Sequence, residues 1–124
     1  MFADTDFLLA LVKETDWLKK SSETILEKHK GSINTSVSVM IELALVCKRQ
    51  RLNVTDVFAS VFELVGINEE TYKLCLNAAL YVEKDALNIF DAFHAAYCGS
   101  DAIISSDSAY DRLGLKRVRL EDNA

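Results

Sequence analysis

Several acidic residues stand where a simple packed fold has little use for a charge. Glu42 is the only charged residue in the segment 36–47, Asp91 lies within the apolar run 89–98, and Asp107 follows a short apolar segment. A lone carboxylate on an apolar helix face costs several kcal/mol unless it is paired, protonated or bound to a cation. Each of these acids is therefore expected either to face solvent or to take part in chemistry.

The solvent interpretation is open for single residues. Glu42 can lie on the outer side of an otherwise buried helix, and Asp91 follows a capping Asn88 by three residues, where an acid stabilises a helix N-terminus by about 0.3–1 kcal/mol. Taken as a set, however, the acids would repel one another if they converged. Only a divalent cation would compensate that charge, and ligands that are all oxygen favour Mg²⁺ or Mn²⁺ over zinc. Such a site suits phosphodiester hydrolysis by a metal-activated water.

The elements that must position these acids follow from periodicity and capping residues. Residues 1–4 predict a strand that leads into a helix capped by Thr5 or Asp6. A second helix is expected from Trp17, with Trp17 on its apolar face. The expected caps of the later helices are Ser36 or Ser38, Asn53 or Thr55, Asn68 and Asn88. Later elements are a strand near 33–35, helices over 36–50, 53–65, 68–84 and 89–98, a strand over 102–105, a helical turn over 108–113 and a strand over 116–120. Strands alternating with helices imply a parallel sheet covered on both faces, with ligands beyond the carboxyl ends of its strands.

The order of the acids resembles the PIN domain family over nearly the whole chain. The matching segments are "FADTDFLLAL" at Asp4, "TSVSVMIELALV" at Glu42, "DAFHAAY" at Asp91 and "IISSDSAYDRLGLKRV" at Asp107. The resemblance implies an α/β fold, namely a three-layer α/β/α sandwich around a central parallel sheet of four to five strands. It also implies an endoribonuclease dependent on Mg²⁺ or Mn²⁺, and many small members are VapC-type toxins neutralised by a small antitoxin.

The same resemblance implies roles for individual residues. Asp4, Glu42, Asp91 and Asp107 would be the catalytic metal ligands. Asp6 and Asp111 would be auxiliary ligands, and Thr5 and Ser105 would orient carboxylates or a metal-bound water. His94 follows Asp91 by three residues, a spacing that can place two ligands on one helix face, but packing or hydrogen bonding is the favoured role.

One departure from the family pattern leaves a second function open. Asp6 stands where the family usually has Asn, and the added negative charge could alter the metal number or leave the site inactive. The alternative is then a catalytically impaired PIN-like module that acts in a complex with an antitoxin or RNA. A haloacid-dehalogenase-type phosphatase built on "DTD" is disfavoured, because 124 residues leave little room for a cap.

Length and composition set the remaining expectations. A chain of 124 residues with 50% hydrophobic residues and no Pro predicts a single domain over 1–124. No apolar stretch is long enough to span a membrane, which predicts a cytoplasmic protein with no membrane partner. The cysteines Cys47, Cys75 and Cys98 are expected to be buried thiols. The net charge of −5 calls for segregated positive charge or bound cations if RNA is the substrate.

A surplus of apolar residues in the second half of the chain predicts an interface. We expect part of this surface to form a homodimer or to bind an antitoxin. The residues concerned are Phe58, Val61, Phe62, Val65, Tyr72, Leu76 and Leu80.

Overall fold

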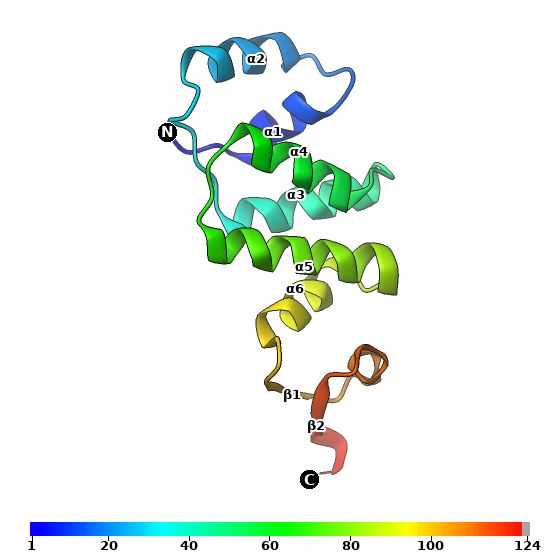
Figure 1. The fold of residues 1–124 in the computed structure, drawn as a ribbon. Coiled ribbons are helices and arrows are strands. Elements are labelled where there is room, and N and C mark those ends of the chain that lie inside the picture. Colours follow the sequence, from blue (N-terminus) through cyan, green and yellow to red (C-terminus); the bar gives the residue numbers. More distant parts are fainter. Residues whose placement is uncertain (123–124) are drawn as a thin grey trace.

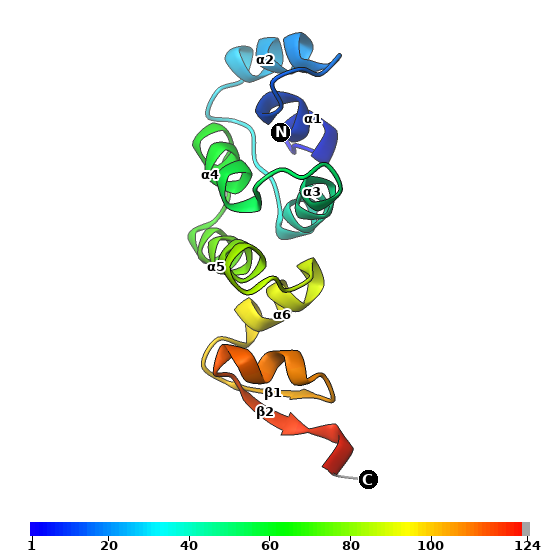
Figure 2. The same cartoon turned by 90° about the vertical axis from the view of Figure 1, so that its right-hand side faces the viewer.

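A computed structural model describes residues 1–122 as an elongated stack of helices that ends in a small parallel sheet (Figure 1). Seen from two directions, the N-terminus lies near α1 and α2 towards one end, and the C-terminal strands lie beyond α6 at the other (Figure 2). The elements are α1 (Thr5–Val12), α2 (Lys19–Lys28), α3 (Val37–Arg49), α4 (Val54–Leu64), α5 (Glu69–Asp85), α6 (Ile89–Cys98), β1 (Ala102–Ser105), η1 (Ser108–Leu113), β2 (Lys116–Arg119) and η2 (Leu120–Asp122).

Side-chain caps define the start of most helices, as the sequence predicted. The side chains of Ser36, Asn53, Asn68 and Asn88 each accept a hydrogen bond from a backbone N–H three residues further on. The cap of α1 was predicted wrongly. Asp4, and not Thr5 or Asp6, caps this helix, and its Oδ1 accepts a hydrogen bond from the Thr5 N–H at 2.7 Å.

The second helix also begins later than predicted. The Asp16 carboxylate accepts from the Leu18 N–H at 2.9 Å and holds a turn there, so α2 starts at Lys19. Trp17, expected on the buried face, is 89% exposed as a result.

The core lies between the helices of the stack. The largest fully buried side chains are Leu8, Met40, Leu43, Cys47, Val54, Phe58, Val61 and Cys75. Phe58 packs with its ring centroid 6.4 Å from that of Phe93 on α6. Burial raises the pKa of the Cys47 thiol to about 11 and that of Cys75 to about 12. The prediction of buried thiols is confirmed for these two, whereas Cys98 is half-buried.

The predicted interface residues divide between the core and the surface. Phe58, Val61 and Val65 are buried within the chain and cannot form an outer surface, so this part of the prediction was wrong. Tyr72 and Leu80 remain 39% and 41% exposed on α5. The buried apolar residues of this set therefore serve mainly the packing of α4 against α5.

The parallel strands form two separate groups in the described residues. β1 and β2 pair in parallel from Ala102↔Lys116 to Ser105↔Arg119. Near the N-terminus, Asn34 forms isolated parallel bridges to both Phe2 and Gly66. The α/β class is confirmed, but the central sheet of four to five strands and the three-layer sandwich are not. The early strands shorten to single bridges because the caps Asp4 and Ser36 begin helices directly after them.

In the part of the chain that the structure describes, no helix is both long and apolar enough to cross a membrane.

Lys19 closes the end of α1, which has no terminal glycine. Its Nζ donates to the carbonyl oxygens of Ala10, Leu11 and Lys13 at 3.4, 3.0 and 2.7 Å. A cation at a helix C-terminus also interacts favourably with the helix dipole. This side chain thus links α2 to α1.

We expect Lys19→Met to lower the free energy of unfolding by about 1.5–3 kcal/mol, because carbonyl oxygens lose a charged donor. Urea denaturation followed by circular dichroism measures the change. The matched control is Lys20→Met, since Lys20 is exposed on the same helix. Equal losses in both variants would show that the contacts of Lys19 contribute nothing specific.

Candidate active site: two pairs of carboxylates

The first pair of predicted site residues meets at the N-terminus of α1. Asp4 follows the bridge residue Phe2 and Ala3, and Glu42 lies on the exposed side of α3. Thr5 lies between them and is only 6% exposed. Its backbone N–H donates to Asp4, and its hydroxyl donates to Glu42 Oε1. The predicted role of Thr5, that of orienting carboxylates, is consistent with these two contacts.

The second pair lies where α6 meets η1. Asp91 Oδ2 accepts from Asn88 Nδ2 at 2.7 Å, and Asp91 Oδ1 accepts from the Tyr110 hydroxyl at 3.1 Å. Asp107 caps η1 by accepting from the Ala109 N–H at 2.8 Å. The Ser105 hydroxyl in turn accepts from the Asp107 N–H at 3.0 Å.

Tyr110 matches the aromatic residue of the last family motif, but the sequence analysis assigned it no role in the site. It is 4% exposed, and burial, the hydrogen bond to Asp91 and the charges of Asp91 and Asp107 raise its pKa to about 12. Both carboxylates therefore lie close enough to oppose ionisation of the phenol. The available signal was an aromatic residue with a polar end, three positions after Asp107.

Asp111 has a different environment from the other acids. Its two carboxylate oxygens accept from Arg117 Nε and Nη2 at 2.8 and 3.0 Å, a bidentate pair. This contact holds the pKa of Asp111 below its ordinary value. Arg117 also donates to the Ser105 carbonyl at 2.9 Å and to Glu121. Asp111 was predicted as an auxiliary metal ligand. In the structure its ion pair with Arg117 joins η1 to β2.

Asp6 and His94 lie apart from these contacts. Asp6 is exposed in the first turn of α1, where its charge favours the helix N-terminus. His94 is exposed on α6 and lines a hollow beside β1.

The donor atoms suit a hard divalent cation, since all four predicted ligands supply carboxylate oxygens. Within residues 1–122, however, no three His, Cys, Asp or Glu side chains lie close enough together to hold a metal ion. The acids occur as the pair around Thr5 and the pair around Tyr110.

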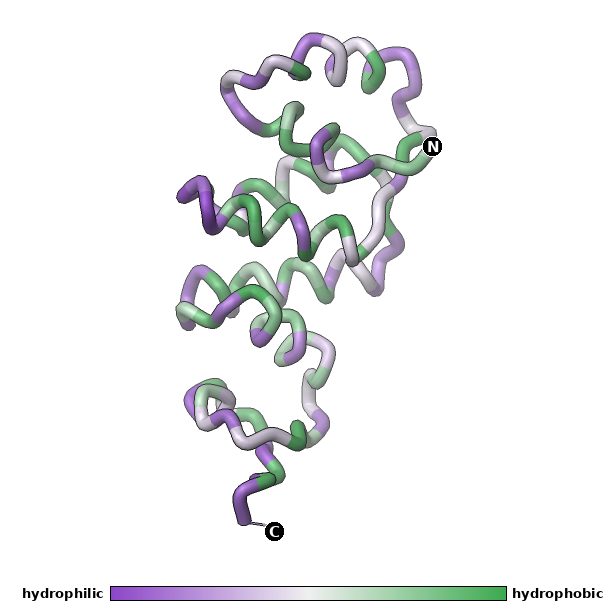
Figure 3. Tube along the Cα trace, turned by 180° about the vertical axis from the view of Figure 1, so that it is seen from behind, coloured by the Kyte–Doolittle hydropathy of each residue, from purple (hydrophilic) through white to green (hydrophobic). Residues whose placement is uncertain are grey.

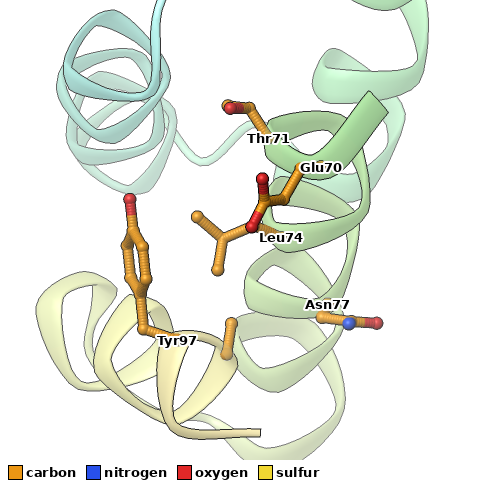
Figure 4. Close-up of a pocket in the computed structure, with 6 residues that line it drawn as sticks. Glu70, Thr71, Leu74, Asn77 and Tyr97 are labelled. Atoms are coloured by element: carbon orange, nitrogen blue, oxygen red, sulfur yellow. The ribbon is translucent and has the colours of Figure 1, made fainter. Parts of the chain in front are cut away.

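A separate pocket of about 450 Å³ lies between α5 and α6, and Figure 4 shows Leu74 and Tyr97 facing it from the two helices. Glu70 is the acidic residue in its lining, and none of the predicted site residues belongs to it. This pocket carries no constellation that would support catalysis.

Comparison with known protein families shows which family the chain resembles over most of its length. The family model of the PIN domain matches residues 1–116 of the chain. The searches of curated proteins and of solved structures found no match.

We expect Tyr110→Phe to lower the free energy of unfolding by about 1 kcal/mol at neutral pH, because one hydrogen bond to Asp91 is lost. The folded pKa of Tyr110, about 12, lies above the ordinary value of 10.0, so this contribution is complete below pH 10 and is lost as the pH rises through about 12. The stability difference between the proteins should therefore narrow above pH 10. Ultraviolet titration of the tyrosines should lose its highest step in Tyr110→Phe but not in Tyr97→Phe, whose ring is 62% exposed.

Proposed function

Since the chain belongs to the PIN domain family, we propose that it is a metal-dependent endoribonuclease that hydrolyses RNA phosphodiester bonds. Proteins of this family are generally nucleases that use divalent metal ions. The observation that carries the proposal is the family match over residues 1–116 of 124, which includes all four acids singled out from the sequence.

The proposed ligands of Mg²⁺ or Mn²⁺ are Asp4, Glu42, Asp91 and Asp107. One acid of each pair accepts a hydrogen bond from a hydroxyl group, Glu42 from Thr5 and Asp91 from Tyr110. Such donors restrain a carboxylate and leave its other lone pairs available to a cation. Two pairs of oriented carboxylates support the assignment better than four freely rotating ones would.

A second candidate function is a PIN-like module that binds a partner without cleaving RNA. The observations that favour it are the separation of the acids into two pairs and the presence of Asp6 at a position where the family pattern has Asn. Calorimetric titration with Mn²⁺ separates the candidates. Binding by the unaltered protein that disappears in Asp91→Asn supports the nuclease, whereas no binding in either protein supports the module.

We expect Asp4→Asn and Asp91→Asn each to reduce metal-dependent RNA cleavage by about two orders of magnitude or more, as when a group that stabilises or positions the reacting atoms is removed. Asn caps a helix about as well as Asp, so Asp4→Asn should keep α1 folded. The assay follows fluorescent RNA with Mg²⁺ or Mn²⁺, and circular dichroism reports the fold.

The control for the cleavage assay is Glu63→Gln, which removes an exposed acid from α4. It should leave the rate unchanged. Full activity in either Asp variant would remove that residue from the assignment.

The biological role that we propose is that of a cytoplasmic toxin, neutralised by a small antitoxin. The resemblance to small stand-alone VapC-type proteins supports this role. Exposed apolar side chains, such as those of Trp17 at 89% and Tyr97 at 62%, offer area to a protein partner.

We expect induced expression of the protein in bacteria to arrest growth and expression of Asp91→Asn to permit it, because the arrest would require RNA cleavage. Colony counts after induction measure the effect, which should exceed about tenfold if the loss of cleavage is as large as estimated above. Equal arrest by both proteins would contradict a toxin that acts by cleavage.

A further inference from the structure

Positive charge gathers where α3 ends and the chain turns into α4. Lys48, Arg49 and Arg51 lie within four successive residues, and no Asp or Glu occurs between Glu42 and Asp56. All three cationic residues are exposed, and none of them forms an ion pair within the described residues. In Figure 3 the connection between α3 and α4 is hydrophilic and lies at the side of the stack. We call these three cationic residues the basic turn.

Several cations in other parts of the chain are already balanced by acids. Arg117 binds both carboxylate oxygens of Asp111, and Lys73 Nζ lies 3.2 Å from Glu69 Oε1. Lys30 shares a hollow with three glutamates. Because the chain has a net charge of −5, a polyanion is repelled by the molecule as a whole and needs a place where positive charge is segregated. The basic turn is such a place.

Arg51 has a backbone conformation that an arginine rarely adopts, with φ = +57°. Its N–H donates to the Lys48 carbonyl at 3.4 Å, and the Leu52 N–H donates to the Cys47 carbonyl at 2.9 Å. This pattern ends a helix with a left-handed residue, a position that glycine ordinarily fills. Glycines with positive φ do follow α2, α6 and η1 in this chain. Since Arg51 is exposed, burial does not offset the strain, and the strain therefore points to a role at the surface.

Stabilisation of the helix explains only part of the basic turn. Lys48 and Arg49 lie in the last turn of α3, where positive charge interacts favourably with the helix C-terminus. Arg51 lies beyond the end of the helix. A glycine there would end the helix without strain, so the helix gives no reason for a cationic side chain at this position.

A polar hollow of about 350 Å³ adjoins the basic turn. Its lining consists of Lys48, Arg51, Leu52, Asn53 and Glu83. Glu83 Oε1 accepts from the Val54 N–H at 2.8 Å, so this carboxylate is engaged by the first turn of α4. Two cations and one engaged carboxylate give the hollow a charge that favours an anionic group. A phosphate suits such a place, because arginine can bind two of its oxygens at once.

The basic turn lies on the helix that carries Glu42, a member of the first carboxylate pair. Arg49 follows Glu42 by seven residues, a spacing that places both on one face of α3 and about 10 Å apart along its axis. Both residues are exposed. An RNA strand that passes Glu42 can therefore continue along this face to the basic turn.

We propose that the basic turn is a phosphate-binding site that holds the RNA strand beside the candidate active site. This inference rests on the proposed function only in taking RNA as the ligand, and it requires no metal ion. Phosphate contacts position a nucleic acid without reading its bases. The basic turn therefore supplies affinity and orientation, and the sequence preference of the protein lies elsewhere.

Binding of a fluorescent single-stranded RNA, measured by anisotropy in EDTA at salt concentrations from about 50 to 200 mM, tests the proposal. Each phosphate contact contributes about 0.7 to the slope of log K against log salt concentration for a single strand. A triple variant combines Lys48→Gln, Arg49→Gln and Arg51→Gly. Its slope should be smaller by about 2, and its affinity at the lowest salt should fall by about tenfold or more.

The single variant Arg51→Gly separates binding from folding. Glycine fits the left-handed position, so the melting temperature should not fall, whereas the salt slope should decrease by about 0.7. Arg51→Lys keeps the charge and should keep the slope. The matched control is Lys28→Gln, which removes an exposed cation from the last turn of α2 and should change neither slope nor affinity.

The outcomes separate this inference from the proposed function. An unchanged slope in the triple variant overturns the basic turn as an RNA site and leaves the nuclease proposal intact. Tighter binding of polyglutamate than of RNA, lost in the triple variant, would assign the turn to an acidic protein segment and overturn the inference as well. RNA binding that depends on the basic turn, in a protein that cleaves no RNA with Mg²⁺ or Mn²⁺, supports the inference while the nuclease function fails. Absence of RNA binding at the lowest salt overturns the inference, and the cleavage assay then decides the nuclease function by itself.

Discussion

A single hydrogen bond, from the Tyr110 hydroxyl to Asp91, determines where half of the candidate site lies. It joins α6 to η1 and, together with the packing of Leu113 and Leu115 against the core, holds β1, η1 and β2 beside α6. Tyr110 is almost fully buried, so a partner for its hydroxyl is required, and Asp91 supplies one. The charge of Asp91 and the nearby charge of Asp107 in turn oppose ionisation of the phenol and keep it a hydrogen-bond donor.

The same principle organises the other half of the site. Thr5, the first residue of α1, is buried; its hydroxyl donates to Glu42 and its N–H donates to Asp4. One acid of each pair, Glu42 or Asp91, is thus bound by a buried hydroxyl group. The acids remain near solvent, but their orientation is set by packed groups, which is the arrangement that a catalytic or cation-binding site requires.

The parallel strands of the chain are the least complete part of its fold. Within residues 1–122 they form two groups, one at the bridge residue Asn34 and one at β1 and β2. An open strand edge is unfavourable because its polar groups and adjoining apolar side chains remain uncovered.

Local physical chemistry made much of this structure predictable from the sequence. The caps Asn68 and Asn88 were identified correctly, and Ser36 and Asn53 were each one of two candidates, because a capping side chain bonds to a backbone group three residues away. The acids themselves were also evident, because a charge within an apolar segment such as 36–47 stands out in any fold. Trp17 was assigned to a buried face because the turn held by Asp16 gives no periodic signal.

Only the tertiary structure decided which groups meet. Neither the link between Thr5 and Glu42 nor that between Asp91 and Tyr110 follows from spacing, since 37 and 19 residues separate the partners. Arg117 likewise binds both oxygens of Asp111 because β2 lies beside β1, and strand pairing depends on contacts between distant parts of the chain. The sequence by itself determined the helices and the acidic residues. The packing of α6 against β1, η1 and β2 determined that those acids form two pairs.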